Sequence, residues 1–196
     1  SSASPFARKA WITAIEAGVG DAVENVAMAV TPHAPNAAFA RENPLMKIPT
    51  LVRDDGTHLY DSAVICEYLD ALGGGRLFPA AGEARWQALR RHALADGIMD
   101  AALVVRYETT LRPEALRWPA WIAGHEAKID YALDAFEQEV DGFGDAFLID
   151  HVALVSALGY LDFRFAGRPW RPGRPKLERW FGDVGKRASV AHTHPS

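Results

Sequence analysis

Residues 47–62 read KIPTLVRDDGTHLYDS, and three local signals follow one another in this stretch. The Ile48–Pro49 bond stands before a run of β-forming residues, and Asp55-Gly56 is typical of a tight hairpin turn. Asp61-Ser62 then opens a segment whose apolar residues repeat at helical spacing. The stretch therefore predicts an antiparallel hairpin followed at once by a helix, with Ser62 as the helix N-cap.

The residues in front of this stretch carry both helix and strand signals. Ser4 suits an N-cap and Pro5 suits the first helical position, so we predict a helix that stops near Gly18. The predicted order across residues 1–72 is α-β-α-β-β-α. After the first helix, its members are a strand at 26–30, a short helix at 36–42, strands at 50–53 and 57–60, and a helix at 62–72.

The second half of the chain carries only helix signals. Residues 73–84 begin with Gly73-Gly74-Gly75 and have the composition of a linker. Beyond them, apolar residues at helical spacing predict four helices. These are centred on residues 86–111, 122–140, 152–161 and 177–184. We therefore divide the chain into an α+β domain at 1–72, a linker at 73–84 and an all-α domain at 85–196.

Composition excludes several classes of function. The chain has 196 residues and a net charge of −4 without a basic stripe, so no nucleic-acid partner is expected. No apolar run approaches the roughly 20 residues of a membrane span, so no membrane partner is expected. The single cysteine, Cys66, gives no metal-site spacing, so no metal is expected, and it fits a reducing cytoplasm.

Four short motifs indicate a family. They are Ser4-Pro5-Phe6, residues 43–49 (NPLMKIP), Tyr60-Asp61-Ser62 and residues 157–164 (ALGYLDFR). In these motifs the chain resembles the cytosolic glutathione S-transferase superfamily, and within it a bacterial glutathione transferase-like branch. The resemblance implies a thioredoxin-like N-terminal domain followed by the all-helical C-terminal domain of that family. The family also places a β-strand before the first helix, so we expect about 4–8 further residues, enough for one short strand, in front of Ser1.

One position departs from the family pattern. The family usually has Ser or Thr, and Asp three residues later, at the start of the helix predicted around 152–161. Together these two residues form a capping box. Here the two positions hold Leu148 and His151. We expect Asp150 to cap that helix instead.

The resemblance implies a glutathione site within residues 47–62. The Ile48–Pro49 bond would be cis and would turn the Ile48 backbone toward the cysteinyl residue of glutathione; an ordinary trans proline is the alternative. Asp61 would face the ammonium of the γ-Glu residue, here or across a dimer interface. Ser62 would bind the γ-Glu carboxylate, because a helix N-terminus attracts anions, unless Ser62 is only a cap.

Three more residues are candidates for the same site. Lys47 would pair with the glycine carboxylate of glutathione, although a lone surface lysine is more often only solvated. His33 is a second candidate for that end of the ligand. Phe6 is included because it belongs to the Ser-Pro-Phe motif.

Ser4 is the candidate activator of the glutathione thiol. A thiol with a pKa of about 8.5 is only a few per cent ionised at neutral pH, so a donor to sulfur and a helix N-terminus would favour the thiolate. Ser1 is the rival and Ser2 a third choice, and Ser4 is alternatively only an N-cap. Serine rather than cysteine at position 4 disfavours a thiol-disulfide reductase, and Cys66 is expected in the core.

The family places its second substrate on the first long helix of the all-α domain. Met99, Arg106 and Tyr107 are the candidates there, although Met99 alone is more simply core and Arg106 more simply surface. The resemblance implies a cytoplasmic, homodimeric glutathione transferase of detoxification, in which glutathione thiolate attacks a small electrophile. The alternative is a glutathione-binding or protein-interaction module that kept the fold without turnover.

Overall fold

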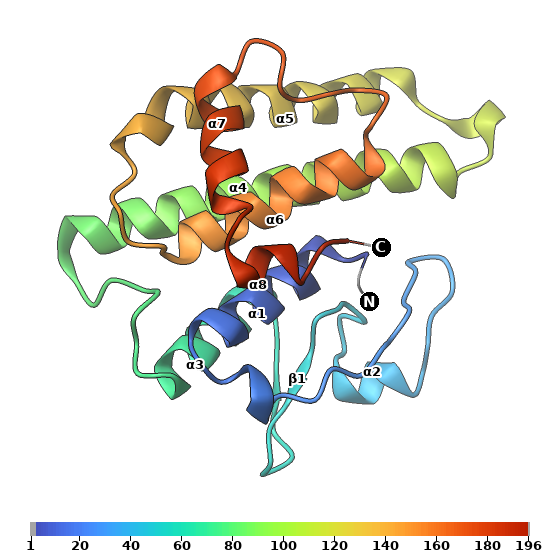
Figure 1. Ribbon diagram of the computed structural model, residues 1–196. Helices are drawn as coiled ribbons and strands as arrows, with labels where there is room; N and C mark the ends of the chain where they lie inside the picture. The colour runs from blue at the N-terminus through green and yellow to red at the C-terminus, as the bar shows by residue number, and fades with distance from the viewer. Residues whose placement is uncertain (1–2, 196) are drawn as a thin grey trace.

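The computed structural model describes residues 3–195 and contains a mixed part followed by a helical part (Figure 1). The mixed part consists of α1 (Pro5–Glu16), η1 (Gly20–Ala22), α2 (Phe39–Glu42), β1 (Leu51–Val52), β2 (His58–Leu59) and α3 (Ser62–Leu72). The helical part consists of α4 (Gly82–Thr110), η2 (Glu114–Leu116), α5 (Pro119–Glu139), η3 (Val140–Gly142), α6 (Ile149–Arg164), α7 (Pro175–Val184) and α8 (Ala188–Ala191). This confirms the predicted fold class. The domain limits stay a prediction, and α4 begins inside the segment assigned to the linker.

The hairpin forms where the sequence predicts it. β1 and β2 pair antiparallel, with Leu51 opposite Leu59. Gly56 takes a φ of 80° in the turn, a left-handed conformation that glycine adopts without a steric penalty. The side chain of Asp55 accepts a hydrogen bond of 2.8 Å from the Thr57 N–H, which closes the turn.

The strand predicted at 26–30 does not form. Residues 24–27 are exposed, and Val26 keeps 68% of its surface accessible. Within residues 3–195 the sheet has two strands, and neither lies beside 26–30 as a partner. An apolar run of strand length becomes a strand only where a ladder of backbone hydrogen bonds can form, so this prediction is wrong.

The cap expected at Asp150 is also wrong. Leu148 takes the N-cap position of α6 and has no side-chain acceptor. His151 replaces part of the capping box, because its Nδ1 accepts a hydrogen bond of 3.2 Å from the Leu148 N–H. Asp150 instead pairs with Arg91 of α4, at 2.7 Å from carboxylate oxygen to Nε.

α6 is the central element of the molecule. All its residues from Ile149 to Leu161 are buried, so it is covered on every side, as a helix surrounded by other helices is. One apolar cluster joins it to α4, α5 and α7, and a second joins it to α1 and α3. Among residues 3–195, no helix is long and apolar enough to cross a bilayer.

Arg8 attaches α1 to this central helix. The side chain is 4% exposed, and it donates hydrogen bonds to the carbonyls of Val155 (3.1 Å) and Val190 (3.2 Å). Burial lowers the pKa of Arg8 to about 10. Gly159 leaves the space that the guanidinium fills, because a Cβ there would lie 2.1 Å from the Arg8 Nη1.

We therefore expect Gly159→Ala to lower the free energy of unfolding by about 1–3 kcal/mol, the usual cost of overpacking, because Arg8 must leave its two carbonyls. The matched control is Gly124→Ala in α5, where no atom lies within 4 Å of the added Cβ. That substitution should stabilise the protein by about 0.5–1 kcal/mol through helix propensity. Urea unfolding of both variants measures the difference, and equal effects would contradict this role of Gly159.

Candidate functional site

Ser4 is the N-cap of α1. Its Oγ accepts a hydrogen bond of 3.3 Å from the Ala7 N–H, and Pro5 follows at the first helical position. The side chain is half-buried. Because Oγ acts there as an acceptor, its own hydrogen is free to be donated to another atom. The cap role and the activator role are therefore compatible. The rivals Ser1 and Ser2 lie outside the described residues.

Asn43 organises the loop that carries the predicted backbone-pairing residue. It is fully buried, and its Nδ2 donates to the Lys47 carbonyl (2.9 Å) and to the Thr50 hydroxyl (3.0 Å). The Ile48–Pro49 bond is cis, as the sequence analysis favours, and so is the Tyr60–Asp61 bond. Within residues 3–195, the Ile48 N–H and C=O have no internal hydrogen-bond partner. They are therefore available to a ligand.

Asp61, rather than Ser62, caps α3. The Asp61 Oδ1 accepts a hydrogen bond of 3.0 Å from the Ala63 N–H, and Ser62 is the first helical residue. The prediction of Ser62 as the cap is wrong by one position, because the preceding carboxylate reaches the helix N–H groups. Ser62 is 4% exposed, and in the described part of the chain its N–H and hydroxyl have no partner. Both donors thus stay available at a helix N-terminus.

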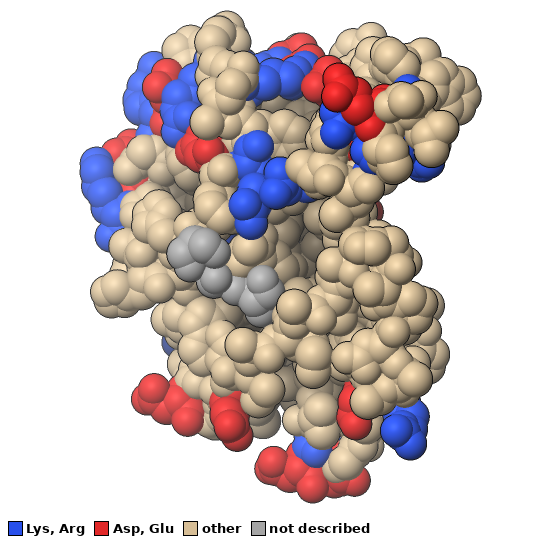
Figure 2. All heavy atoms as spheres, turned by 90° about the vertical axis from the view of Figure 1, so that its right-hand side faces the viewer, with Lys and Arg blue, Asp and Glu red and all other residues tan. Residues whose placement is uncertain are grey.

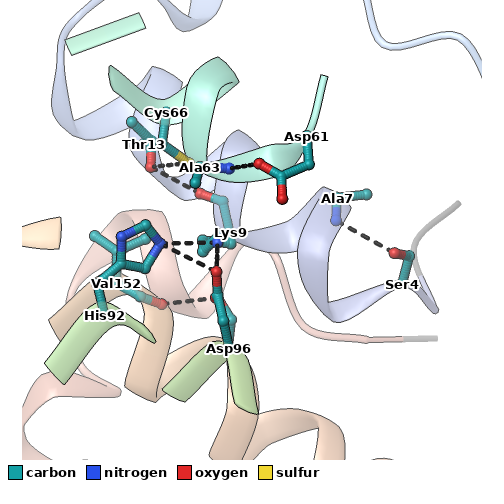
Figure 3. A network of polar contacts seen from close by, with 11 residues as sticks. Ser4, Ala7, Lys9, Thr13, Asp61, Ala63, Cys66, His92, Asp96 and Val152 are labelled. Carbon is teal, nitrogen blue, oxygen red and sulfur yellow. Dashed lines mark hydrogen bonds and ion pairs between the residues drawn. The ribbon is translucent and has the colours of Figure 1, made fainter. Parts of the chain in front are cut away.

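A buried ion pair lies behind this helix start (Figure 3). Lys9 of α1 is fully buried, and its Nζ lies 2.7 Å from both carboxylate oxygens of Asp96 and 2.8 Å from the His92 Nε2. Burial, together with the Lys9 charge, lowers the pKa of His92 to about 3, so the ring is neutral and accepts from Lys9. These three residues were not predicted. The signal in the sequence was a lysine on the buried face of α1, between Phe6 and Ala10.

Carboxylates gather around the start of α3. Burial raises the pKa of Asp96 and of Asp100, and the negative charge of Asp61 adds to both shifts. Lys9 opposes the shift at both positions, and Lys47 opposes it at Asp100. Anion-binding donors on Ser62 therefore stand beside an acidic group. This combination suits a zwitterionic α-amino acid group, whose carboxylate and ammonium need opposite partners.

The remaining candidates for the same ligand differ in their exposure and in their contacts. Lys47 is exposed, and its carbonyl is held by Asn43. His33 is exposed in the turn between Thr31 and Ala34. Phe6 is partly buried against the core of the helical part, and the Lys9 ammonium lies 5.7 Å from its ring centre.

The second-substrate candidates separate into two kinds. Met99 is fully buried within the helical core, so it does not face an open site, and its inclusion is corrected. Tyr107 is 36% exposed and Arg106 is partly exposed. Both act electrostatically on Tyr160 of α6, whose pKa is raised mainly by burial. Arg164 acts on the same phenol and was not among the predicted residues.

Cys66 has the properties of a core residue. Its thiol is fully buried, and burial raises its pKa to about 11. The Thr13 hydroxyl lies 3.3 Å from the sulfur (Figure 3). A thiol that is both buried and protonated is unreactive, which confirms the expectation that Cys66 belongs to the core.

Two surface hollows lie away from the candidate residues. One of about 410 Å³ is lined by Ile15, Glu16 and residues 187–189, at the end of α1 opposite Ser4. A second, of about 220 Å³, lies beside the start of α6 and includes His151 and Trp180. Neither contains a residue predicted from the sequence to bind ligand. The candidate site is therefore defined by the donors and charges around α1 and α3, not by hollow size.

Known proteins match the chain over nearly its whole length. Residues 3–72 match the family model of the glutathione S-transferase N-terminal domain, and residues 119–183 match that of its C-terminal domain. The GST-like protein YibF of Escherichia coli (strain K12) is 33% identical over 98% of this chain and 95% of its own length.

Two solved structures are similar in sequence and in shape. A glutathione transferase family member from Pseudomonas fluorescens Pf-5 with bound glutathione is 42% identical. It superposes with a TM-score of 0.97 over 100% of this chain and 97% of its own. A structure of a family member from the same strain, with bound S-(propanoic acid)-glutathione, is 40% identical. Its TM-score is 0.93 at the same coverage of both chains.

The buried pair at Lys9 gives a stability test. Asp96→Asn leaves a buried ammonium without its counter-charge, so we expect the free energy of unfolding to fall by about 3 kcal/mol. The double variant Lys9→Met/Asp96→Leu removes both charges and should recover most of that loss. Asp183→Asn is the control: its partner Lys186 is 77% exposed, and an exposed ion pair contributes little, so the loss should be much smaller. An Asp96→Asn loss no larger than the control would contradict a structural role for the pair.

Proposed function

The chain belongs to the glutathione S-transferase superfamily, and from this premise we propose that it binds glutathione and transfers it to a small electrophile. The observation that carries the proposal is the start of α3. Asp61 offers a carboxylate there, and among residues 3–195 neither the two donors of Ser62 nor the Ile48 backbone groups have a hydrogen-bond partner. Structurally similar relatives were crystallised with glutathione or a glutathione conjugate bound.

Each end of glutathione has a partner in this proposal. The α-carboxylate of the γ-Glu residue accepts from the N–H and hydroxyl of Ser62, and its ammonium faces Asp61. The cysteinyl residue pairs with the N–H and C=O of Ile48 beside Pro49. Lys47 takes the glycine carboxylate, with His33 as the second choice for that role. Six contacts along a tripeptide would hold its thiol in one place, which is the proximity part of the rate enhancement.

Ser4 supplies the chemical part. Its hydroxyl donates to the glutathione sulfur, and the positive end of α1 lies behind it, so the thiolate is favoured over the thiol. The thiolate then forms a bond to the electrophilic carbon of the second substrate. Phe6, in the first turn of α1, packs against the helical core and fixes this end of α1 relative to the proposed second-substrate surface around Arg106 and Tyr107.

We also propose that the enzyme is a cytoplasmic homodimer with a role in detoxification. Val64 of α3 is 47% exposed and Trp86 of α4 is 63% exposed, although both are large apolar side chains. These two helices lie before and after the segment that connects the two parts of the chain. Large apolar side chains that are exposed there are the kind of surface that a second copy covers. Asp61 lies at the start of α3, close to that surface.

The γ-Glu anchor is tested by two single-atom changes. Asp61→Asn keeps the helix cap and removes the charge, so glutathione binding should weaken by about 1.5–3 kcal/mol, as for a charged hydrogen bond. Ser62→Ala keeps the N–H and removes the hydroxyl, so the loss should be about 0.5–1.5 kcal/mol. Titration calorimetry measures both, with Asp21→Asn in the loop after α1 as the control. Unchanged affinity in both variants would remove this site from consideration.

The activator is tested by the pH dependence of turnover. Ser4→Ala should raise the pKa of the bound thiol and lower kcat near neutral pH, and the loss should shrink at high pH, where thiolate forms unaided. Glutathione affinity should change little. The lost cap costs about 0.5–2 kcal/mol of stability, so the melting temperature is measured alongside. Ser1→Ala is the matched variant, and Ser4 is only a cap if Ser1→Ala alone moves the titration. Glutathione binding with no turnover on any electrophile would support the non-catalytic alternative.

A further inference from the structure

The stretch between α1 and β1 has little buried surface of its own. Of the described residues 18–50, two are buried: Phe39 of α2 and Asn43, which directly follows α2. In the described part of the chain, one ion-pair contact involves this stretch, and it joins Glu42 to His58. The stretch lies at the lower right in Figure 1. Figure 2 looks onto that side, and in its lower half the charged atoms lie toward the bottom. Apolar packing and ion pairs therefore do little to fix the loop that contains Ile48.

The side chain of Asn43 holds this loop at three points. Its Oδ1 accepts a hydrogen bond of 2.9 Å from the Leu45 N–H. Its Nδ2 donates to the Lys47 carbonyl and to the Thr50 hydroxyl, and that hydroxyl also donates to the Lys47 carbonyl at 3.0 Å. A carbonyl can only accept and a backbone N–H can only donate, so these partners fix which way the amide points. One buried amide thus determines the course of residues 45–50.

Met46 shows that the loop is held in a conformation that the chain would otherwise avoid. Its φ is 50°, and among residues 3–195 it is the one residue other than glycine with a positive φ. The left-handed conformation is unfavourable for methionine and persists only where the surrounding structure determines it. The Met46 N–H donates to the Asn43 carbonyl at 2.8 Å, so Asn43 supplies this contact as well.

The contacts of Asn43 act directly on Ile48. The Lys47 carbonyl and the Ile48 N–H belong to one planar peptide unit, and this bond is not one of the two cis bonds in the described residues. In a trans unit the N–H points away from the carbonyl. Because Asn43 and Thr50 hold the carbonyl on the inner side, the Ile48 N–H is turned outward. Hydrogen bonds to the carbonyl also polarise the unit, which strengthens its N–H as a donor.

We propose that Asn43 is a positioning residue for glutathione, which aims the N–H and C=O of Ile48 at the cysteinyl residue without touching the ligand. This inference rests on the proposed function and adds a residue to it. In an antiparallel pair the two residues exchange both backbone bonds, so a change in the direction of one group weakens both. Without Asn43, the turn at Met46 relaxes and the peptide unit before Ile48 is free to rotate.

The test uses two ligands that differ in one paired backbone group. Titration calorimetry compares S-methylglutathione with its analogue in which an ester oxygen replaces the N–H of the cysteinyl residue. We expect the wild type to prefer the amide roughly five-fold, as for one neutral hydrogen bond. Asn43→Ala should reduce the preference to less than about two-fold, because the partner group on Ile48 is no longer aimed. The ratio of the two affinities cancels any loss of folded protein.

Two further variants and a control separate positioning from stability. Thr50→Val removes the half-buried hydroxyl of the same network and should lower the preference in part, and it carries the test if Asn43→Ala does not fold. Asn43→Ala/Met46→Gly should regain part of the preference, because glycine adopts a positive φ without the steric cost. Asp70→Asn is the matched control. Asp70 is also buried and accepts from the N–H groups of residues 76–78, so its change should lower the melting temperature and leave the preference unchanged.

The outcomes separate this inference from the proposed function. A preference that is lost in Asn43→Ala and lowered in Thr50→Val, but kept in the control, supports the positioning role even if no electrophile is turned over. The transferase proposal is then the one that fails. A wild type without the preference, or an Asn43→Ala protein that keeps it, overturns the positioning role alone. Failure of the wild type to bind either ligand overturns both.

Discussion

The attachment of α1 to the helical part determines the geometry of everything else. Two neighbouring buried cations make it: Arg8 bonds to carbonyls of α6 and α8, and Lys9 pairs with Asp96 of α4. Taking two positive side chains out of water is costly, so each must be fully satisfied for the helix to dock in one position only. Ser4 begins this helix. Its hydroxyl is thereby fixed relative to both α3 and the second-substrate surface.

Lys9 also affects the pKa values of the residues around it. Burial together with the Lys9 charge lowers the pKa of His92, and Lys9 opposes the upward pKa shifts of Asp96 and Asp100. These carboxylates lie beside a helix N-terminus, which itself favours anions. Asp61 has two roles in the proposed site: one oxygen caps α3, and the carboxylate is the proposed partner of the ligand's ammonium. The proposed site for an ammonium and a carboxylate would thus depend on one buried lysine and one cap.

Local signals in the sequence predicted local structure well. The hairpin, the start of α1 and the helices of the second half follow from turn residues, caps and apolar spacing, and the structure confirms them. The predictions that were wrong concerned segments whose structure depends on partners far away in the chain. Among residues 3–195, the apolar run at 26–30 has no strand as a partner. Asp150 forms an ion pair with Arg91 of α4 instead of capping α6. The role of Lys9 was not predicted, since its partner Asp96 is 87 positions away in the chain.

The candidate site also has one half that local sequence signals predict and one half that depends on the packing of distant segments. The glutathione half is made of backbone groups, a cap and one helix N-terminus, so its parts lie within a stretch of 16 residues that the sequence shows directly. The second-substrate half is proposed to lie around Arg106 and Tyr107 of α4, and its surroundings depend on how α4 packs against α5 and α6. Glutathione, the proposed co-substrate, can thus be bound by residues that lie close together in the sequence. Choice of the electrophile depends on how the helices pack, and no short motif in the chain records it.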